Sequence, residues 1–284
     1  MAYPPIEQSC YWLATRTPVP AQPLHGDREA DVAIVGAGLT GLWAALTLKQ
    51  LEPGTAVTVV EQGTAAYGAS GRNAGMLSET VDHGHGLAIQ HFGEAEASRL
   101  AALGERNIAG MYDDLTRWQI DCDLERTGRL MVALTEPQLE ECRRTIEVAR
   151  QLGLESFSYL DRDAVRQELH SPLYLGGVRV TGGGILNPVK LVDGLAREAR
   201  RQGVVIHEQS KVLSVVAEGA GARVRVAGGS VLARKVILAT SAYTHHLLPE
   251  VLTRFIPLYD YVLVSQPLSS SQWDTLGWQR RQGL

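Results

Sequence analysis

Residues 31–41 combine a short apolar strand, a glycine-rich turn and the start of a helix. Val32–Val35 is an apolar run, and Gly36, Gly38 and Gly41 follow it with G-x-G-x-x-G spacing. The first glycine permits a tight turn, the second lets a phosphate approach bare backbone, and the third lets helix and strand pack closely. The N–H groups at the start of such a helix favour an anion. This segment therefore predicts an α/β sheet with a phosphate-binding turn at its edge.

A second strand brings an acidic residue to the position that dinucleotide-binding domains use. Ala56–Val60 predicts the strand, and Glu61 follows it, twenty residues after Gly41. A carboxylate at this position accepts a hydrogen bond from the 2′-hydroxyl of an adenosine ribose. Because strand, turn, helix and acid occur in this order, the sequence predicts a binding site for an adenine dinucleotide.

Composition and charge limit the classes of partner. The chain has 284 residues, of which 45% are hydrophobic, and a formal net charge of −4. This length suffices for one large domain or two ordinary ones. The sequence has no block of lysines or arginines, which argues against nucleic acid or an anionic membrane as a partner. Cys10, Cys122 and Cys142 are far apart, so they predict neither a disulfide framework nor a zinc site.

The N-terminal residues and the hydropathy predict a cytoplasmic protein. Residues 1–27 lack the basic segment and apolar stretch of a signal peptide. Their prolines predict an extended arm on the surface. No uninterrupted apolar run approaches membrane-spanning length, so we expect no membrane span.

A group of histidines between residues 83 and 91 lacks the spacing of a metal site. Glycine separates His83 from His85, and the three histidines do not combine with a carboxylate or cysteine in a recognised metal-binding motif. The sequence therefore predicts no metal ligands.

Four short apolar segments predict the parallel strands of a single sheet. They are residues 32–35, 56–60, 204–207 and 235–239, and the last is typical of a strand buried on both faces. The residues at about 120–175 do not fit this sheet. The predicted fold is therefore α/β, with a discontinuous dinucleotide-binding domain and a second, inserted domain.

Other elements carry strong local signals. Asn187 followed by Pro188 predicts the start of a helix. Thr135 fits the N-cap of a capping box, and Asp161 fits the N-cap of a further short helix. Additional predicted elements are a helix at 94–120, a strand at 126–135, a meander at 211–217, 223–227 and 230–233, and a strand at 258–264.

Five segments carry a pattern that extends well beyond the glycine turn. They are residues 31–41, Glu61, and residues 68–75, 184–188 and 236–240. Together they resemble the FAD-dependent D-amino-acid oxidase superfamily, with the glycine/sarcosine oxidase-like and gamma-glutamylputrescine oxidase-like members the most similar. The resemblance covers residues 8–280, and the loop at 68–75 is its most specific part.

This resemblance implies which residues contact the cofactor FAD. The glycine turn would hold the pyrophosphate and Glu61 the adenosine ribose, while the loop at 70–75 would pass the pyrophosphate and the flavin ring. Val212 would meet the adenine through its backbone. The implied cofactor-binding residues are Gly36, Ala37, Gly38, Gly41, Glu61, Ser70, Gly71, Arg72, Asn73, Gly75, Val212, Ala239 and Thr240.

The resemblance also implies the chemistry. In this family the C–N bond of a primary or secondary amine or amino acid is oxidised by hydride transfer to the flavin, and the electrons pass to oxygen or another acceptor. The protein supplies orientation and electrostatics, so no catalytic side chain is predicted. Tyr259 and Tyr261 lie on a predicted strand of the substrate domain and are candidates for lining the amine pocket; a place on a sheet face is the alternative.

The family pattern implies a Rossmann-like FAD-binding domain with an inserted α+β substrate domain. The expected divisions are an N-terminal arm at 1–27, FAD-binding parts at 28–118 and 175–245, and substrate-domain parts at 119–174 and 246–284. Members of the family continue beyond the point equivalent to Leu284 with the rest of the substrate sheet and a glycine-rich segment at the flavin. We therefore expect a fold that is truncated at its C-terminus.

Two other functions stay open at this point. A truncated, catalytically inactive chain would bind only a nucleotide or a partner. A nicotinamide-dependent dehydrogenase would share the glycine turn, although the loop at 68–75 and the meander before Lys235 argue against it.

Overall fold

A computed structural model describes residues 10–17, 22–81, 84–258 and 260–284. The chain divides into two compact units, the first comprising Met1–Ala74, Ile120–Cys122 and Asn187–Leu263, and the second Gly75–Gln119, Asp123–Leu186 and Val264–Leu284. These divisions differ from the expected domains: residues 75–118 belong to the second unit, and residues 246–263 to the first. Helical periodicity marks an apolar face, but it does not say which core that face joins.

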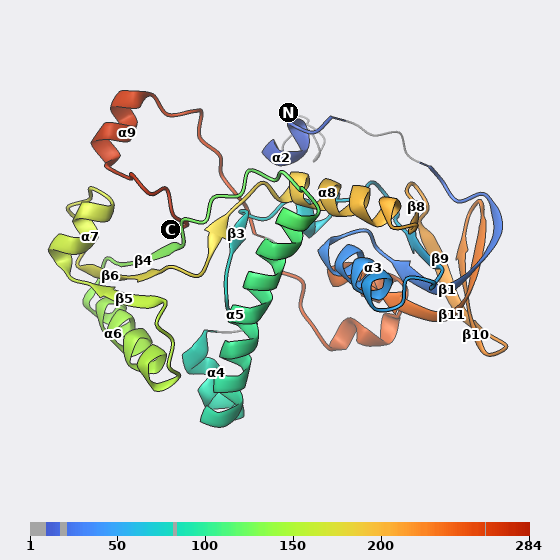
Figure 1. Ribbon diagram of the computed structural model, residues 1–284, viewed down its shortest axis with the longest axis horizontal. Coiled ribbons are helices and arrows are strands. Elements are labelled where there is room, and N and C mark those ends of the chain that lie inside the picture. Colours follow the sequence, from blue (N-terminus) through green and yellow to red (C-terminus); the bar gives the residue numbers. More distant parts are fainter. Residues whose placement is uncertain (1–9, 18–21, 82–83, 259) are drawn as a thin grey trace. The chain divides into compact units, whose positions relative to one another are not determined.

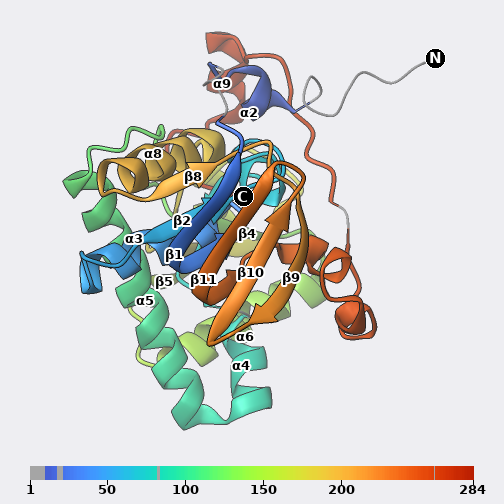
Figure 2. The ribbon, with the colours of Figure 1, turned by 90° about the vertical axis from the view of Figure 1, so that its right-hand side faces the viewer.

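The first unit contains a six-stranded sheet with the order β8-β2-β1-β11-β10-β9 (Figure 2). The strands are β1 (Gly26–Val35), β2 (Val57–Val60), β8 (Val205–His207), β9 (Val212–Glu218), β10 (Gly221–Val226) and β11 (Gly229–Leu238). The first four strands in this order are parallel, which confirms the predicted parallel sheet. The meander of β9, β10 and β11 is antiparallel.

Strand β11 belongs to both parts of this sheet. It pairs in parallel with β1 from Gly26↔Gly229 to Val35↔Leu238, and its first half pairs antiparallel with β10. The sequence predicted two strands here, because charged residues interrupt the apolar run at Arg234. That side chain is exposed and forms an ion pair with Asp31 at 3.2 Å, so the strand continues through it. The expected burial on both faces is wrong, since residues 236–238 are only partly buried.

Two helices, α3 (Leu39–Leu51) and α8 (Pro188–Arg201), lie side by side against the sheet (Figures 1 and 2). The predicted cap of α8 is confirmed, since Asn187 Oδ1 accepts hydrogen bonds from the N–H groups of Val189 (3.1 Å) and Lys190 (3.2 Å). A core that includes Ala33, Val224 and Val231 packs on the sheet. The short helices of this unit are α2 (Tyr11–Ala14), η1 (Ala69–Gly71), η2 (Ser241–His246) and η3 (Pro249–Thr253).

The second unit is built around a three-stranded antiparallel sheet with the order β4-β6-β5. The strands of the second unit, inside and outside this sheet, are β3 (Met76–Leu77), β4 (Arg129–Ala133), β5 (Phe157–Leu160), β6 (Gly176–Val180) and β7 (Gly184–Ile185). Its helices are α4 (His85–Phe92), α5 (Glu94–Arg117), α6 (Glu136–Gln151), α7 (Arg162–Glu168) and α9 (Ser270–Leu276). The predicted N-caps of α6 and α7, Thr135 and Asp161, are both confirmed.

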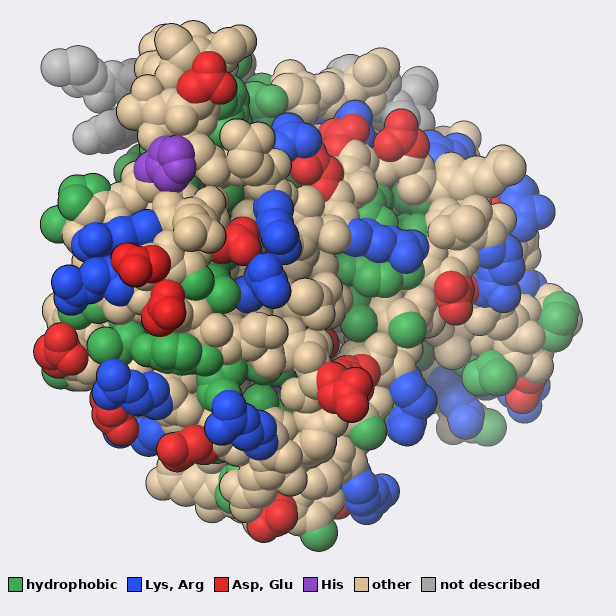
Figure 3. Space-filling model, turned by 60° about the vertical axis from the view of Figure 1, so that its left-hand side comes forward, with side chains coloured by type: hydrophobic (Ala, Val, Ile, Leu, Met, Phe, Trp, Pro, Cys, Tyr) green, Lys and Arg blue, Asp and Glu red, His purple; other side chains and the backbone are tan. Residues whose placement is uncertain are grey.

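Charged side chains of both signs are interspersed on the face shown in Figure 3. Helix α6 contributes pairs three residues apart, such as Arg143 with Glu140 at 3.1 Å. Such exposed pairs contribute little to stability because water and salt screen them. Among the described residues, no helix is both long and apolar enough to cross a membrane.

Candidate functional site

The first and third glycines of the turn are required by close backbone packing. Gly36 has φ +108°, and a Cβ there would lie 2.6 Å from the carbonyl oxygen of Ala239. A Cβ on Gly41 would lie 2.0 Å from the carbonyl oxygen of Gly36, so the first turn of α3 lies directly on the end of β1. The Gly36 N–H donates to the carbonyl of Val60 at 2.9 Å, which ties the turn to β2.

The second glycine begins the helix beside the loop of residues 68–73. A Cβ on Gly38 would lie 2.7 Å from Ser70 Oγ, and this hydroxyl accepts a hydrogen bond from the Leu39 N–H at 3.0 Å. The first turn of α3, within Leu39–Leu51, carries no acidic residue. The positive end of the helix dipole is therefore not neutralised by a carboxylate of its own first turn.

Glu61 follows β2 and turns its carboxylate toward the same turn. Its Oε2 accepts a hydrogen bond from the Ala37 N–H and its Oε1 one from the Gly63 N–H, both at 2.9 Å. Burial raises the pKa of the Glu61 carboxyl above its ordinary value, and these two N–H donors oppose the shift. Each carboxylate oxygen retains capacity to accept a further hydrogen bond.

These residues surround a pocket at the carboxyl ends of the parallel strands, where ligands of open α/β sheets bind. Its empty volume is about 960 Å³, part of it open to solvent. The predicted residues that line it are Gly36, Gly38, Glu61, Ser70, Val212, Ala239 and Thr240. The structure thus brings together residues from four separate parts of the chain.

Other predicted residues lie next to this pocket without lining it. Arg72 Nε donates to the Tyr67 carbonyl at 2.7 Å, and its guanidinium lies 5.0 Å from the centre of the Tyr67 ring. The Asn73 side chain donates to the carbonyls of Ala69 and Ser70 at 3.2 and 3.0 Å. Both side chains therefore shape the loop from within. The remaining predicted residues that do not line the pocket are Ala37, Gly41, Gly71 and Gly75.

One predicted cofactor residue belongs to the other compact unit. Gly75 lies in the second unit, has φ +75°, and its carbonyl accepts a hydrogen bond from the Leu186 N–H at 2.8 Å. Its place beside the pocket stays a prediction.

Sequence reasoning missed several pocket residues. Those outside the glycine turn and the strand ends are Gln62, Ala66, Tyr67, Gly68, Ala69, Lys211, Ser241, Tyr243, His246 and Leu247. Lys211 and Ser241 are chain neighbours of Val212 and Thr240, so adjacency alone would have indicated them. Tyr243 and His246 stack on each other in η2, with ring centroids 6.3 Å apart, and no sequence pattern marks that helix.

The predicted strand at 258–264 is not formed in the described residues of that segment. Tyr259 lies outside the described residues. The Tyr261 side chain belongs to an irregular segment, is 91% exposed and does not line the pocket described above. Alternating aromatic residues favour a strand, but a strand also needs a partner for its backbone groups.

The described residues contain no group of three or more histidine, cysteine or acidic side chains placed to bind a metal. His83 lies outside those residues. The three cysteines are all free thiols.

Comparison with known proteins places this chain in a family. Residues 31–282 match the family described as FAD dependent oxidoreductase. A probable oxidoreductase of Haemophilus influenzae is 30% identical over 281 residues, which cover 97% of this chain and 64% of that protein. The gamma-glutamylputrescine oxidoreductase of Escherichia coli is 32% identical over 263 residues, which cover 92% and 61%.

The fold agrees with this match. The crystal structure of glycine oxidase from Geobacillus kaustophilus superposes with a TM-score of 0.68 at 24% identity, over 79% of this chain and 58% of that one. The chain therefore spans less than two thirds of the length of these relatives. The family cofactor is FAD, which removes the nicotinamide alternative. The glycine turn, the half-buried acid and the match over nearly the whole chain show that this protein belongs to the FAD-dependent oxidoreductase family.

Proposed function

We propose that the protein takes part in the FAD-dependent oxidation of the C–N bond of a primary or secondary amine or amino acid. Two relatives support this substrate class by name, a gamma-glutamylputrescine oxidoreductase and a glycine oxidase. The observation that carries the proposal is the pocket itself, in which bare glycine backbone and the half-buried acid Glu61 meet at the carboxyl ends of parallel strands.

The residues present fit the adenosine and pyrophosphate half of FAD. Gly36 and Gly38 leave their backbone open to the pocket, and the N-terminal turn of α3 would favour the negative pyrophosphate. Glu61 would accept hydrogen bonds from ribose hydroxyls, because its oxygens are already fixed by the N–H groups of Ala37 and Gly63. Val212 lines the same pocket and would meet the adenine.

The remaining proposed contacts come from the loop and from the end of β11. Ser70, Gly71, Arg72 and Asn73 would present the loop to the cofactor, with Gly75 at its far end. Ala239 and Thr240 would close over the cofactor, since both line the pocket directly after β11. Arg72 is held by the Tyr67 carbonyl, so its contribution would be to keep the loop in place.

When bound, FAD supplies the acceptor for a hydride equivalent from the amine carbon, and the oxidised substrate leaves as an imine that hydrolyses. The chain's own contribution is to bind and orient the cofactor. We assign no catalytic side chain, and we propose oxygen or another oxidant as the final electron acceptor. We propose this activity for a protein of the full length of the relatives.

A flavin titration tests this proposal. Purified protein mixed with FAD should retain a flavin absorption band after removal of free cofactor, whereas NAD should not compete. Anaerobic addition of amines, with gamma-glutamylputrescine, glycine and sarcosine as a first panel, should bleach that band. Absence of a retained flavin band contradicts cofactor binding by this chain, and a band that no amine bleaches favours a chain that only binds the nucleotide.

A further inference from the structure

The turn at residues 64–67 forms a wall of the pocket and has an unusual backbone. Ala66 and Tyr67 line the pocket, and Ala66 has φ +68°, in the left-handed region that non-glycine residues rarely adopt. A Cβ on Gly71 would lie 2.1 Å from the Ala66 carbonyl oxygen, so the following loop lies directly on this turn. Such a conformation persists only where the surroundings impose it.

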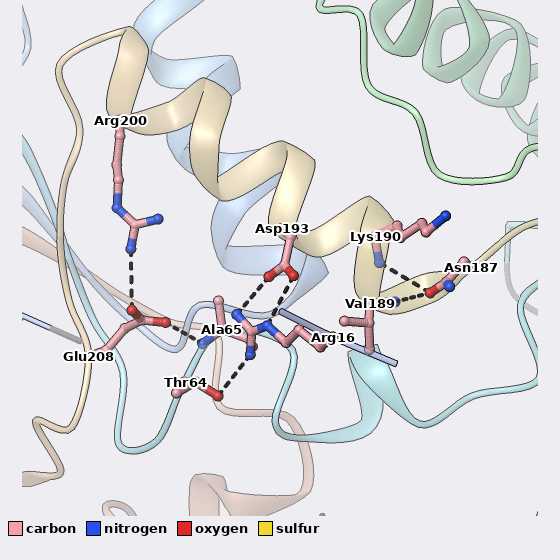
Figure 4. A network of polar contacts seen from close by, with 9 residues as sticks. All are labelled: Arg16, Thr64, Ala65, Asn187, Val189, Lys190, Asp193, Arg200 and Glu208. Atoms are coloured by element: carbon pink, nitrogen blue, oxygen red, sulfur yellow. Dashed lines mark hydrogen bonds and ion pairs between the residues drawn. The ribbon is translucent and has the colours of Figure 1, made fainter. Parts of the chain in front are cut away.

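Two charged side chains hold the peptide groups of this turn from both sides (Figure 4). Arg16 Nη1 donates to the Ala65 carbonyl and to Thr64 Oγ1, both at 3.0 Å. Glu208 Oε1 accepts a hydrogen bond from the Ala65 N–H at 2.7 Å. The N–H and the carbonyl of one residue, Ala65, are therefore each bound by a charged group.

Both charged side chains are themselves fixed by helix α8. Arg16 forms a two-pronged pair with Asp193, with Nε to Oδ2 at 3.0 Å and Nη2 to Oδ1 at 2.7 Å. Glu208 pairs with Arg200 at 3.4 Å. The Arg16 and Glu208 side chains are 12% and 3% exposed, so water competes little for these contacts.

Other residues of the same N-terminal segment contact the loop that follows. The Trp12 indole N–H donates to the Asn73 carbonyl at 3.0 Å, and the Cys10 thiol lies 3.7 Å from the Gly71 carbonyl oxygen. Residues 10–16, which we call the N-terminal brace, therefore contact both the turn at residues 64–67 and the predicted cofactor loop that follows it. The sequence predicted only an extended surface arm here.

We propose that the N-terminal brace is a positioning element of the FAD site, in which the Arg16–Asp193 pair, acting with Glu208, holds residues 64–67 in the conformation that forms the pocket wall. Arg16 does not line the proposed FAD pocket and acts through Thr64 and Ala65. When only a fraction of the molecules has the binding conformation, the apparent affinity for the ligand is reduced by that fraction. This inference rests on the proposed cofactor site but assigns a role to residues outside it.

The variant Arg16→Met tests the proposal, with Arg223→Met as a matched control. Arg223 also forms a two-pronged pair, with Glu218, and is 21% exposed, but it lies on β10 and lines no part of the FAD pocket. We expect Arg16→Met to raise the dissociation constant for FAD at least about tenfold, and Arg223→Met to leave it within about twofold. Arg16→Lys should fall between wild type and Arg16→Met, because lysine keeps the charge without the fork.

Hydrogen exchange of the FAD-free protein separates local positioning from general destabilisation. The amides of Ala65 and Tyr67 should exchange faster in Arg16→Met than in wild type, while those of β1 and α3 stay protected. The double variant with Asp193→Asn should bind FAD about as weakly as Arg16→Met alone, because the two residues act as one unit.

Three results would overturn the proposal. One is an Arg16→Met protein whose FAD affinity and exchange match wild type. Another is uniformly faster exchange throughout β1 and α3, which would indicate loss of the whole fold. A third is a double variant, Arg16→Met with Asp193→Asn, whose loss of FAD affinity equals the sum of the two single losses. If wild-type protein retains no FAD, the proposed cofactor site fails, and the exchange of Ala65 and Tyr67 still decides whether the brace orders the turn.

Discussion

Ala37 and Glu61 lie 24 residues apart in the chain, yet the Ala37 N–H donates a 2.9 Å hydrogen bond to Glu61 Oε2. This contact joins the turn after β1 to the end of β2. The two strands are parallel neighbours in the sheet. It fixes the orientation of the carboxylate before any ligand arrives. A ligand that needs an acceptor at this point therefore meets one already oriented, which lowers the entropy lost on binding.

Removal of the Glu61 carboxylate should weaken FAD binding. We expect Glu61→Ala to lose about 1.5–3 kcal/mol, the usual range for a hydrogen bond to a charged group, which corresponds to an increase of roughly 10–150-fold in the dissociation constant. Glu61→Gln should lose less, because the amide oxygen can still accept. Fluorescence titration with FAD measures both. The exposed Glu52→Gln serves as a control, and a Glu61→Ala protein with wild-type affinity would exclude this role.

The same carboxyl group should make folding stability depend on pH. Burial raises the pKa of Glu61 above its ordinary value of 4.5 in the folded state. The folded state then binds this proton more tightly than the unfolded chain does. The free energy of unfolding therefore falls as pH rises from 4.5 through the raised pKa, and it levels off above it.

Denaturant unfolding of wild type and Glu61→Gln between about pH 4 and about pH 7 measures this effect. Other carboxyl groups titrate in both proteins, so the difference between the two free energies isolates Glu61. The free energy of unfolding of wild type should fall relative to that of Glu61→Gln as pH rises. A constant difference over the whole range would show that Glu61 has its ordinary pKa.

The third glycine of the turn should not tolerate a methyl group. A Cβ on Gly41 would lie 2.0 Å from the Gly36 carbonyl oxygen, so Gly41→Ala must push α3 away from β1. We expect a loss of about 1–3 kcal/mol in the free energy of unfolding, as for other overpacked sites, together with weaker FAD binding. Gly54→Ala is the matched control, because a Cβ there meets no atom within 4 Å. Equal stability of the two variants would contradict the packing argument.

Much of the dinucleotide fold could be predicted because its signals are local. The glycine turn, the acid after β2 and the Asn187 cap each depend on residues close together in the chain, where backbone geometry dictates the residue type. The βα unit also accounts for the neighbouring places of β1 and β2, whereas β8 and β11 join these strands from distant parts of the chain.

Other features depend on contacts that no local pattern records. Arg16 lies in a proline-rich segment, where the sequence alone does not distinguish it from a surface arginine. Its partners Asp193 and Thr64 are 177 and 48 residues away. The sequence predicts two strands in place of β11 because Arg234 interrupts an apolar run, and the pairing with β1 keeps the strand continuous. The strand expected around Tyr261 has suitable residues but no partner within the described chain.

The capping box of α6 offers a test confined to the second unit. Gln138 Oε1 accepts hydrogen bonds from the N–H groups of Leu134 and Thr135, at 2.8 and 3.1 Å, and the Thr135 hydroxyl caps the Gln138 N–H. We expect Thr135→Ala to lower the free energy of unfolding by about 1 kcal/mol, measured by denaturant unfolding. FAD affinity should stay at the wild-type value, whereas Thr135→Ser should retain most of the stability.

The irregular segment after η3 should promote self-association. Ile256, Leu258 and Leu263 are 84%, 86% and 95% exposed, an unusual concentration of large apolar side chains on a protein surface. Replacing all three by serine should reduce the concentration-dependent increase in light scattering. Leu51→Ser, at a single exposed site that is 74% exposed, is the control. Unchanged scattering in the triple variant would show that other surfaces drive association.

The pairing of β1 with β11 has a consequence for how the chain is made. Asp27 and Ser230 on these strands lie 203 residues apart, and their side chains meet at 2.7 Å. On the ribosome, β1 emerges early, but its neighbour β11 is translated only after residues 75–119 and 123–186 of the second unit have been read. At about 5–20 residues per second, the nascent β1 edge waits for roughly ten to forty seconds. Chaperone protection of that edge would therefore matter most during synthesis.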